Sequence, residues 1–347
     1  MSTHEAPQAG DLEAARLLLA RLGVNPADLL ADTAGSTERP VPTVAEWIPV
    51  VTGLVPPSTA RAYRSYWARA EAAWGERRLD EVTASDIRAQ AEKAKATAVV
   101  RRNSRGGRSA AENFVAALRC LYRHAEDDGL IDERRNPARR VTTPRRLPST
   151  RRALPDERLS EIIEVVAATG DDPELDTLLV RLHIETACRR GGALALRLRD
   201  LDTDQCLLFL REKAETVRWQ PVSPTLMRHL ETHARTRGAT HPDTPVLRYA
   251  RSGPLTRRRY DHLWNRVARH LPWARAQQIS THWLRHTTLT WVERHFGFAT
   301  AHAYAGHTDS HDNATSTYVK ADLTDIATAL ATLTGEDHPL AHDRRQH

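Results

Sequence analysis

The chain has 347 residues, more than one domain usually holds, so we expect two domains with separate cores. The composition is 40% hydrophobic with a formal net charge of +6, and the basic excess indicates a polyanionic partner. Only three cysteines occur and none are spaced as CxxC, which argues against a disulfide framework and against a cysteine zinc site.

Residues 1–42 predict a lead-in with one short helix. The start of the chain lacks the basic and apolar pattern of a signal peptide, and no apolar run approaches the ~18 residues of a membrane span. We therefore expect a cytoplasmic protein without a membrane partner. Residues 11–22 predict an amphipathic helix, and the stretch from there through Pro42 predicts a loosely ordered segment to which we assign no chemistry.

Residues 43–143 predict a helical first domain. Ser58 is placed to cap a helix from Thr59 to Trp74. Large and small apolar residues recur there at helical spacing and define a core face, namely Tyr63, Tyr66, Trp67, Ala70 and Trp74. A further helix is expected from Ser109 to Asp128, and Gly129 is placed to end it.

Clusters of arginine indicate contact with a phosphate backbone. From Arg134 to Arg152 the chain carries eight arginines and no acidic residue, and three prolines there disfavour continuous helix. We interpret this stretch as an extended basic strap, with the interdomain linker at residues 144–155; a solvated charge run is the alternative. A second cluster lies around Gly106 and Gly107, where both interpretations apply. The arginines expected to bind DNA are Arg101, Arg102, Arg139, Arg140, Arg145 and Arg146.

Residues 156–333 predict a second domain, followed by a polar tail at 334–347. It starts with a helix near Asp156 to Thr169, and a leucine stripe then predicts another helix. Cys206 to Leu210 and Val217 to Val222 predict two short strands around a turn. The region from Pro224 to Leu333 is mainly helical by its pattern.

Five separate segments of this domain together contain the groups that transesterification of a phosphodiester requires: a nucleophile, charge stabilisation and an acid for the departing oxygen. Arg189 and Arg285 are suited to clamp the non-bridging oxygens, because guanidinium donors match phosphate geometry. His282 lies three residues before Arg285, so on a helix the two share one face.

The remaining roles have candidates as well. His307 is placed to donate a further hydrogen bond to the phosphate, and the surrounding positive charge would favour ionisation of Tyr318 from its usual pKa of about 10. Lys213, in the turn between the predicted strands, suits protonation of the leaving oxygen, because lysine loses its proton more readily than arginine. Lysine occurs only at Lys93, Lys95, Lys213 and Lys320, which makes its presence in this turn informative.

Each residue alone has a plainer interpretation. In an arginine-rich chain with 17 histidines, an isolated HxxR match is more often a surface pair. Tyr318 alone is more often a packing residue, and Lys213 alone a solvated turn residue. Their order along the chain favours one shared site.

The segment TACRRGGALALRLRDLD resembles the first-arginine box of the tyrosine recombinases, the phage integrase family. HWLRHT, AGHT and TYV resemble the second box and the nucleophile segment, and EKAETVRWQPV resembles the family's hairpin, with Lys213 followed by Arg218 and Pro221. Residues 43–140 are similar to the core-binding domain. The resemblance implies a mainly α fold with a small β-sheet (α+β): a helical SAM-like core-binding domain and a tyrosine-recombinase catalytic domain, forming a C-shaped DNA clamp.

What the resemblance implies for activity is site-specific DNA recombination or integration. Carried over position by position, it assigns phosphate activation to Arg189, Lys213, His282, Arg285 and His307, and covalent attack to Tyr318. Strands would be cleaved and rejoined through a 3'-phosphotyrosyl intermediate, with no ATP, metal or other cofactor. The implied partners are double-stranded DNA at specific recombination sites, further copies of the chain in a tetrameric synapse, and an accessory directionality factor.

The chain departs from the family pattern in two places. Ala187 stands where a glycine usually follows the threonine, and Gly192 stands where an acidic residue usually follows the first arginine, so both bear on the support of Arg189. Tyr304 is a second tyrosine near His307 but precedes it. An apolar stripe near the C-terminus would either dock on a neighbouring protomer or fold back on its own domain; it comprises Ile326, Leu330 and Leu333.

Two other functions remain open at this point. A type IB topoisomerase-like enzyme would nick and reseal with a tyrosine too, but would relax any supercoiled DNA instead of exchanging defined sites. A catalytically inactive DNA-binding accessory protein would need neither Lys213 nor Tyr318. A histidine metal site is disfavoured, because Trp283 stands where an HExxH motif has its glutamate.

Overall fold

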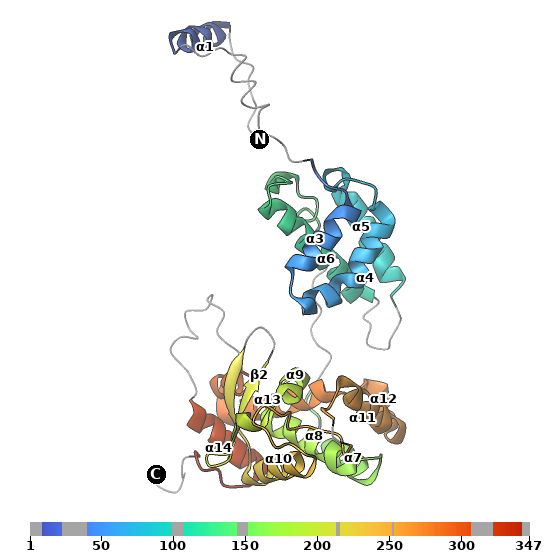
Figure 1. Ribbon diagram of the computed structural model, residues 1–347, viewed down its shortest axis with the longest axis vertical. Coiled ribbons are helices and arrows are strands. Elements are labelled where there is room, and N and C mark those ends of the chain that lie inside the picture. The colour runs from blue at the N-terminus through green and yellow to red at the C-terminus, as the bar shows by residue number, and fades with distance from the viewer. Residues whose placement is uncertain are drawn as a thin grey trace. The chain divides into compact units, whose positions relative to one another are not determined.

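The structure is a computed structural model, and it describes residues 9–22, 40–98, 107–143, 152–212, 216–251, 253–306 and 322–341. The chain divides into two compact units, Met1–Leu147 and Pro148–His347 (Figure 1). Helix α1 (Ala9–Arg21) confirms the helix predicted near the start of the chain, and its Leu17 and Leu18 side chains are exposed. No helix within the described ranges is both long and apolar enough to cross a membrane.

The first unit is helical, as predicted. Its elements are α3 (Val44–Leu54), α4 (Pro57–Trp74), the 3-10 turn η1 (Leu79–Glu81), α5 (Ala84–Ala96), α6 (Arg108–Asp127) and the turn η3 (Glu133–Arg135). Trp67 and Trp74 of α4 and Phe114 of α6 are buried in one core, while Tyr63 only packs against its edge. The Trp67 indole donates a hydrogen bond to the Ala117 carbonyl at 3.0 Å, which satisfies its polar atom inside that core.

The ends of these helices test two sequence predictions. The cap predicted at Ser58 is wrong, because α4 begins earlier: Pro56 is its N-cap and Pro57 occupies the first helical position, where a missing N–H costs nothing. The stop predicted at Gly129 is confirmed. Gly129 adopts φ +70°, and its amide donates to the Glu126 carbonyl at 2.9 Å, which ends α6.

The segment that follows α6 packs on the first unit. Ala138 and Val141 are buried in its core, and Arg119 Nη2 donates to the Val141 carbonyl at 2.7 Å. Residues 134–143 therefore form turns against the helices, and the prediction of an extended strap is wrong for this part, because its two apolar side chains are drawn into the core. Residues 144–151 of the predicted strap lie outside the described residues.

The second unit is mainly helical around a three-stranded sheet, which confirms the predicted fold class. Its helices are α7 (Asp156–Ala168), α8 (Pro173–Thr186), α9 (Arg190–Ala195), α10 (Pro224–Thr236), α11 (Arg257–His270), α12 (Pro272–Gln277), α13 (Thr281–Tyr304) and α14 (Leu323–Thr334). The strands β1 (Leu201–Asp202), β2 (Leu207–Arg211) and β3 (Val217–Pro221) pair in that order. Both pairings are antiparallel, and Arg211 lies opposite Val217. The hairpin is thus confirmed, and only β1 was not foreseen.

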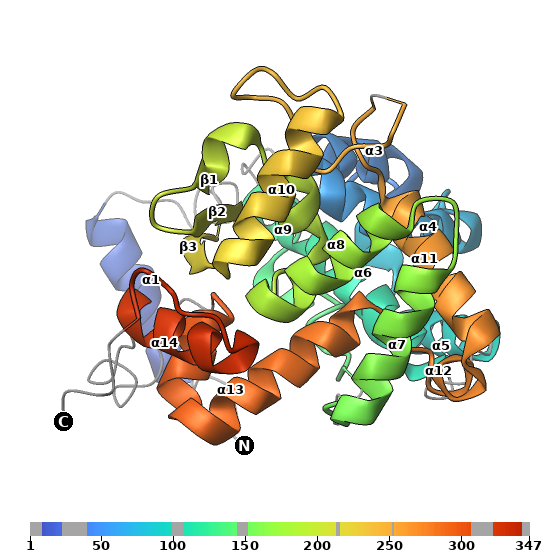
Figure 2. The ribbon, with the colours of Figure 1, turned by 90° about the horizontal axis from the view of Figure 1, so that it is seen from below.

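Helix α13 crosses the second unit and carries part of the candidate site. Gly297 breaks its helical geometry with φ +83°, a value that glycine accepts without strain. Helix α14 lies beside α13 (Figure 2). Beyond the break, Tyr304 belongs to one core cluster with Ile326 and Leu330 of α14 and with Ala187. The C-terminal stripe therefore folds back on its own unit in this structure, which is one of the two alternatives left open by the sequence.

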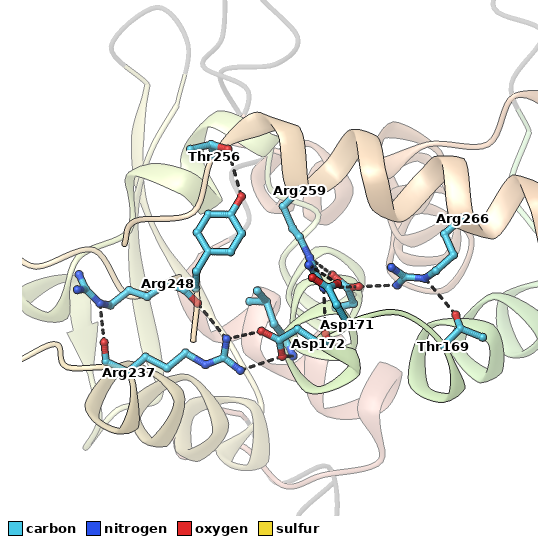
Figure 3. Close-up of polar contacts among 11 residues, drawn as sticks. Thr169, Asp171, Asp172, Arg237, Arg248, Thr256, Arg259 and Arg266 are labelled. Carbon is cyan, nitrogen blue, oxygen red and sulfur yellow. Dashed lines mark hydrogen bonds and ion pairs between the residues drawn. The ribbon is translucent and has the colours of Figure 1, made fainter. Parts of the chain in front are cut away.

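Helix α8 is held in place by a network of buried ion pairs (Figure 3). Asp176 is fully buried, and it accepts hydrogen bonds from Arg259 Nε at 2.6 Å and from Arg266, both on α11. Asp172, at the start of α8, accepts from Arg237 Nη2 at 2.9 Å. These bonds fix the N-terminal half of the helix whose other end presents Arg189.

Candidate active site

The candidate site begins where α8 ends. Ala187, its C-cap, adopts φ +48° and ψ +21°, a left-handed conformation that explains why glycine is the usual residue there. Its amide still donates to the His183 carbonyl at 3.1 Å, and its methyl group is buried beside Tyr304. The chain therefore keeps the sharp turn without glycine, and the turn delivers Arg189 to the start of α9.

Arg189 is held by the carboxylate of Glu212, which follows β2. The Arg189 backbone amide donates to Glu212 Oε1 at 2.5 Å, and its guanidinium Nη1 donates to Oε2 at 2.6 Å. The Glu212 side chain is 0% exposed and that of Arg189 is 38% exposed. The guanidinium thus reaches the surface from a buried anchor.

Arg285 comes from the second turn of α13 and is buried against the C-terminal ends of two helices, α8 and α13. Its Nη2 donates to the Ala305 carbonyl at 2.7 Å, and its Nη1 bonds the Ala187 carbonyl. Burial and, after it, the positive charge of Arg189 lower the pKa of Arg285, and Glu212 partly offsets them, so that the pKa is about 10. This cation is therefore in an environment short of negative charge.

Arg218 of β3 is a third guanidinium beside the same turn. It bonds the carbonyls of Tyr304 and Thr186, and burial lowers its pKa. Its Nε is buried without a hydrogen-bond partner among the described residues. Gly306 lies against it with φ +63°, and a Cβ there would stand 2.6 Å from Arg218 Cδ, so only glycine fits.

Three of the six predicted catalytic residues lie in the part of the chain that the structure describes. Arg189 and Arg285 are gathered around the end of α8, and His282 lies exposed in the first turn of α13, one turn before Arg285. Lys213, His307 and Tyr318 lie outside the described residues, although Glu212 and Gly306 directly precede the first two.

Tyr304, the other tyrosine of this region, is a core residue. It is 0% exposed, its hydroxyl donates to the Glu185 carbonyl, and burial raises its pKa far above the usual value. A phenol in this setting stays protonated and enclosed.

The candidate DNA-binding arginines of the first unit are described only in part. Arg139 Nη2 donates to Glu126 Oε2 at 3.0 Å, and Arg139 also pairs with Glu133. Arg140 bonds the Arg134 carbonyl. Four of the predicted arginines lie outside the described residues: Arg101, Arg102, Arg145 and Arg146.

Sequence reasoning missed Glu212 as part of the site. It lies 23 residues from Arg189 along the chain, so no helical or strand periodicity relates the two. The sequence did contain one signal. Gly192 stands where the family usually has an acidic residue, and an acidic residue, Glu212, stands directly before Lys213.

Comparison with solved structures shows which class of fold this is. A lambda integrase dimer bound to a core site superposes with a TM-score of 0.58 at 15% identity, over 81% of this chain and 99% of that one. The Tn1549 transposon integrase in complex with circular intermediate DNA gives a TM-score of 0.59 at 15% identity, over 80% and 98% of the two chains. At this identity the likeness establishes the fold alone.

Sequence comparison then gives the family. Residues 152–324 match the model of the phage integrase family. The tyrosine recombinase XerC of Chlamydia trachomatis is 27% identical over 221 residues, which is 60% of this chain and 66% of the relative. The chain belongs to the phage integrase family, that is, to the tyrosine recombinases.

Proposed function

We propose that this chain is a site-specific DNA recombinase, an integrase, that cuts and rejoins DNA strands through a phosphotyrosyl bond. The observation that carries the proposal is the gathering of Arg189, Arg218 and Arg285 around the end of α8, with Glu212 as their countercharge. Burial, and after it the charge of Arg189, lower the pKa of Arg285, and a phosphate placed there would supply the negative charge that this environment lacks.

In the proposed reaction, the Tyr318 oxygen attacks phosphorus and the bond to the 5' oxygen breaks. Arg189 and Arg285 stabilise the charge on the non-bridging oxygens, and His282 and His307 donate further hydrogen bonds. Lys213 gives a proton to the departing 5' oxygen, and the phenol proton passes to water. The phosphotyrosine keeps the bond energy, so a 5' hydroxyl can reverse the step without ATP or metal.

Tyr318 is preferred to Tyr304 as the nucleophile because of the surroundings of Tyr304. A phenol whose hydroxyl donates to a backbone carbonyl inside the core can neither ionise readily nor reach a phosphate. The family motif at Thr317-Tyr318-Val319 supports the same choice.

Double-stranded DNA at a specific recombination site is the proposed partner, contacted by both domains (43–143 and 156–333) and by the linker in a C-shaped clamp. The solved lambda integrase assemblies include a dimer on a core site and a tetramer on a Holliday junction, which supports a tetrameric synapse here. An accessory directionality factor and a cytoplasmic location complete the proposal.

The test uses a nicked DNA substrate, with magnesium chelated, that carries the recombination site found beforehand by searching the DNA beside the gene for a repeated sequence. After cleavage the short strand diffuses away, so the covalent adduct is trapped. We expect an adduct on the peptide containing Tyr318, none with Tyr318→Phe, and an undiminished yield with the matched control Tyr304→Phe. No wild-type adduct would favour the inactive DNA-binding protein. Relaxation of supercoiled DNA that lacks the site would favour the topoisomerase.

A further inference from the structure

Glycine at position 192 leaves a space that another residue fills. A Cβ built on Gly192 would lie 3.1 Å from Glu212 Cγ and 3.3 Å from Glu212 Oε1. The place that a side chain at position 192 would enter is therefore already occupied by a carboxylate. This carboxylate arrives from the end of β2 instead of from α9.

The same carboxylate grips Arg189 at two points. One oxygen accepts from the backbone amide at 2.5 Å, and the other accepts from the guanidinium at 2.6 Å. Because Arg189 is the N-cap of α9, the first bond fixes the main chain at the helix start and the second fixes the side-chain direction. A guanidinium has five N–H donors, and the bond to Glu212 uses one on Nη1, so the group can still donate to phosphate oxygens.

Glu212 is also joined to Thr216, which lies on the other side of Lys213 in the sequence. Its backbone amide donates to the Thr216 carbonyl at 2.8 Å, immediately beyond the last pair of the β2–β3 ladder. One residue therefore connects the arginine expected to clamp the phosphate with the strand that leads to the proposed acid. A fully buried carboxylate is costly to desolvate, and a plain surface arginine would not require it.

We propose that Glu212 is a positioning residue for the cleavage reaction: its carboxylate holds Arg189 in the phosphate-clamping orientation and replaces the acidic residue that the family usually carries at position 192. This inference rests on the proposed recombinase function. Glu212 contacts Arg189, and in this proposal it acts on the reaction through that guanidinium.

The first test removes the carboxylate. We expect Glu212→Ala to lower the single-turnover cleavage rate on saturating DNA about 100-fold, as misplacing a reacting group by an ångström typically does, with DNA affinity changed less than about threefold. Glu212→Gln keeps one acceptor for the Arg189 amide but loses the charge. Its cleavage rate should lie between those of the wild-type protein and Glu212→Ala.

The decisive test moves the carboxylate. Gly192 is not among the glycines with positive φ, so an L residue is conformationally allowed there. We expect Gly192→Asp alone to be defective, because it places a second carboxylate against Glu212. The double variant Gly192→Asp with Glu212→Ala should cleave at least about tenfold faster than Glu212→Ala alone, because the new carboxylate enters the vacated space beside Arg189.

The matched control is Asp200→Ala. Asp200 holds Arg211, the residue next to Glu212, with oxygen–nitrogen distances of 2.6 and 2.7 Å and with exposures of 2% and 38%, close to those of the Glu212–Arg189 pair. Its loss should lower the melting temperature and leave the cleavage rate near wild type at a permissive temperature. If Glu212→Ala, like Asp200→Ala, lowered the melting temperature but left the cleavage rate near wild type, Glu212 would have only a structural role and the proposal would fail.

A substrate with sulfur in place of the 5' oxygen separates the two routes by which Glu212 acts. A defect transmitted through Arg189 should persist on that substrate, whereas one transmitted through Lys213 should be relieved, because a thiolate needs no proton. Three results would each overturn the proposal. They are full recovery of Glu212→Ala on the sulfur substrate, wild-type cleavage by Glu212→Ala, and a double variant no faster than Glu212→Ala. Adduct formation by the wild-type protein, run in parallel, shows that the proposed function itself stands; without it both fail.

Discussion

Arg285 Nη2 lies 2.7 Å from the carbonyl oxygen of Ala305, while Nη1 of the same side chain bonds the carbonyl of Ala187. One buried guanidinium thus joins the end of α8 to the end of α13. Because Ala187 precedes Arg189 by two residues, Arg285 also holds the turn that presents the other proposed clamp residue.

We expect Arg285→Ala to bind DNA but to cut it at least about 100-fold more slowly, the usual cost of removing a donor that faces developing charge. The carbonyls of Ala187 and Ala305 lose their partner too, so stability should fall by about 1–3 kcal/mol. Arg189→Ala should show the same loss of cleavage. Binding titrations and single-turnover assays measure both effects, and wild-type rates in either variant would contradict the proposed clamp.

Lys213→Ala should lose cleavage of the normal substrate and regain much of it when sulfur replaces the leaving 5' oxygen. The physical reason is that the departing thiolate is stable without a proton, whereas an alkoxide is not. Parallel single-turnover rates on the two substrates give the ratio. Equal defects on both would assign Lys213 a positioning role.

DNA affinity should fall steeply with salt, because each arginine that neutralises a phosphate releases a counterion. Replacing both Arg145 and Arg146 with alanine should reduce the slope of log affinity against log salt by about 2. Arg139→Ala is the matched control: its pairing with Glu126 and Glu133 should make the change smaller. A nearly flat salt response of the wild-type protein would remove the basic strap from the mechanism.

Asp176→Asn should destabilise the protein by about 3–5 kcal/mol, because Arg266 would stay buried without this countercharge and Arg259 would keep only the exposed Asp171. The control is Asp243→Asn, whose pairs with Arg197 and Arg199 are about half exposed and should contribute less than about 1 kcal/mol. Urea unfolding of the two variants makes the comparison. Similar losses would mean that the network in Figure 3 contributes no more than a surface pair.

Stability should also fall in mild acid through His183. Its Nδ1 donates to the Cys188 carbonyl at 3.1 Å, its Nε2 accepts from the Tyr260 hydroxyl at 2.9 Å, and burial lowers its pKa to about 4. Below pH about 6.5 the unfolded chain takes up a proton that the folded chain refuses, so stability declines from there toward pH 4.

One such histidine gives a slope of up to about 1.4 kcal/mol per pH unit in that window. Urea unfolding between pH 5 and 7 should show a flatter dependence for His183→Gln than for the wild-type protein. His241→Gln, whose side chain is 73% exposed, should leave the slope unchanged. An unaltered slope in His183→Gln would show that another group controls acid unfolding.

Periodicity explains which parts of the fold were predictable. The spacing of Trp67 and Trp74 along α4, and the leucines along α8, reports burial of one helix face, and these residues do lie in the two cores. The hairpin followed from β-forming residues on both sides of a polar turn. Ser58 misled because proline at the first helical position overrides a serine further inside.

The site was predictable only where residue type alone indicates chemistry. Arg189 and Arg285 became candidates because guanidinium suits phosphate, yet the carboxylate that holds Arg189 was not foreseen. Glu212 reaches Arg189 through tertiary packing, which no local pattern encodes. The folding of 134–143 onto the first unit escaped notice for the same reason, since its charge is evident in the sequence and its two buried apolar residues are not.

The packing of α14 on the end of α13 has a kinetic meaning. Tyr304 and Ile326 lie in one small core cluster with Ala187, the residue two before Arg189, so α13 and α14 both pack against the turn that presents Arg189. A side chain carried by a tightly packed turn has less freedom to lose when it meets a phosphate, which favours the geometry needed for reaction. The apolar contacts of Ile326 and Leu330 would thereby contribute to the rate of DNA cutting as well as to the stability of the unit.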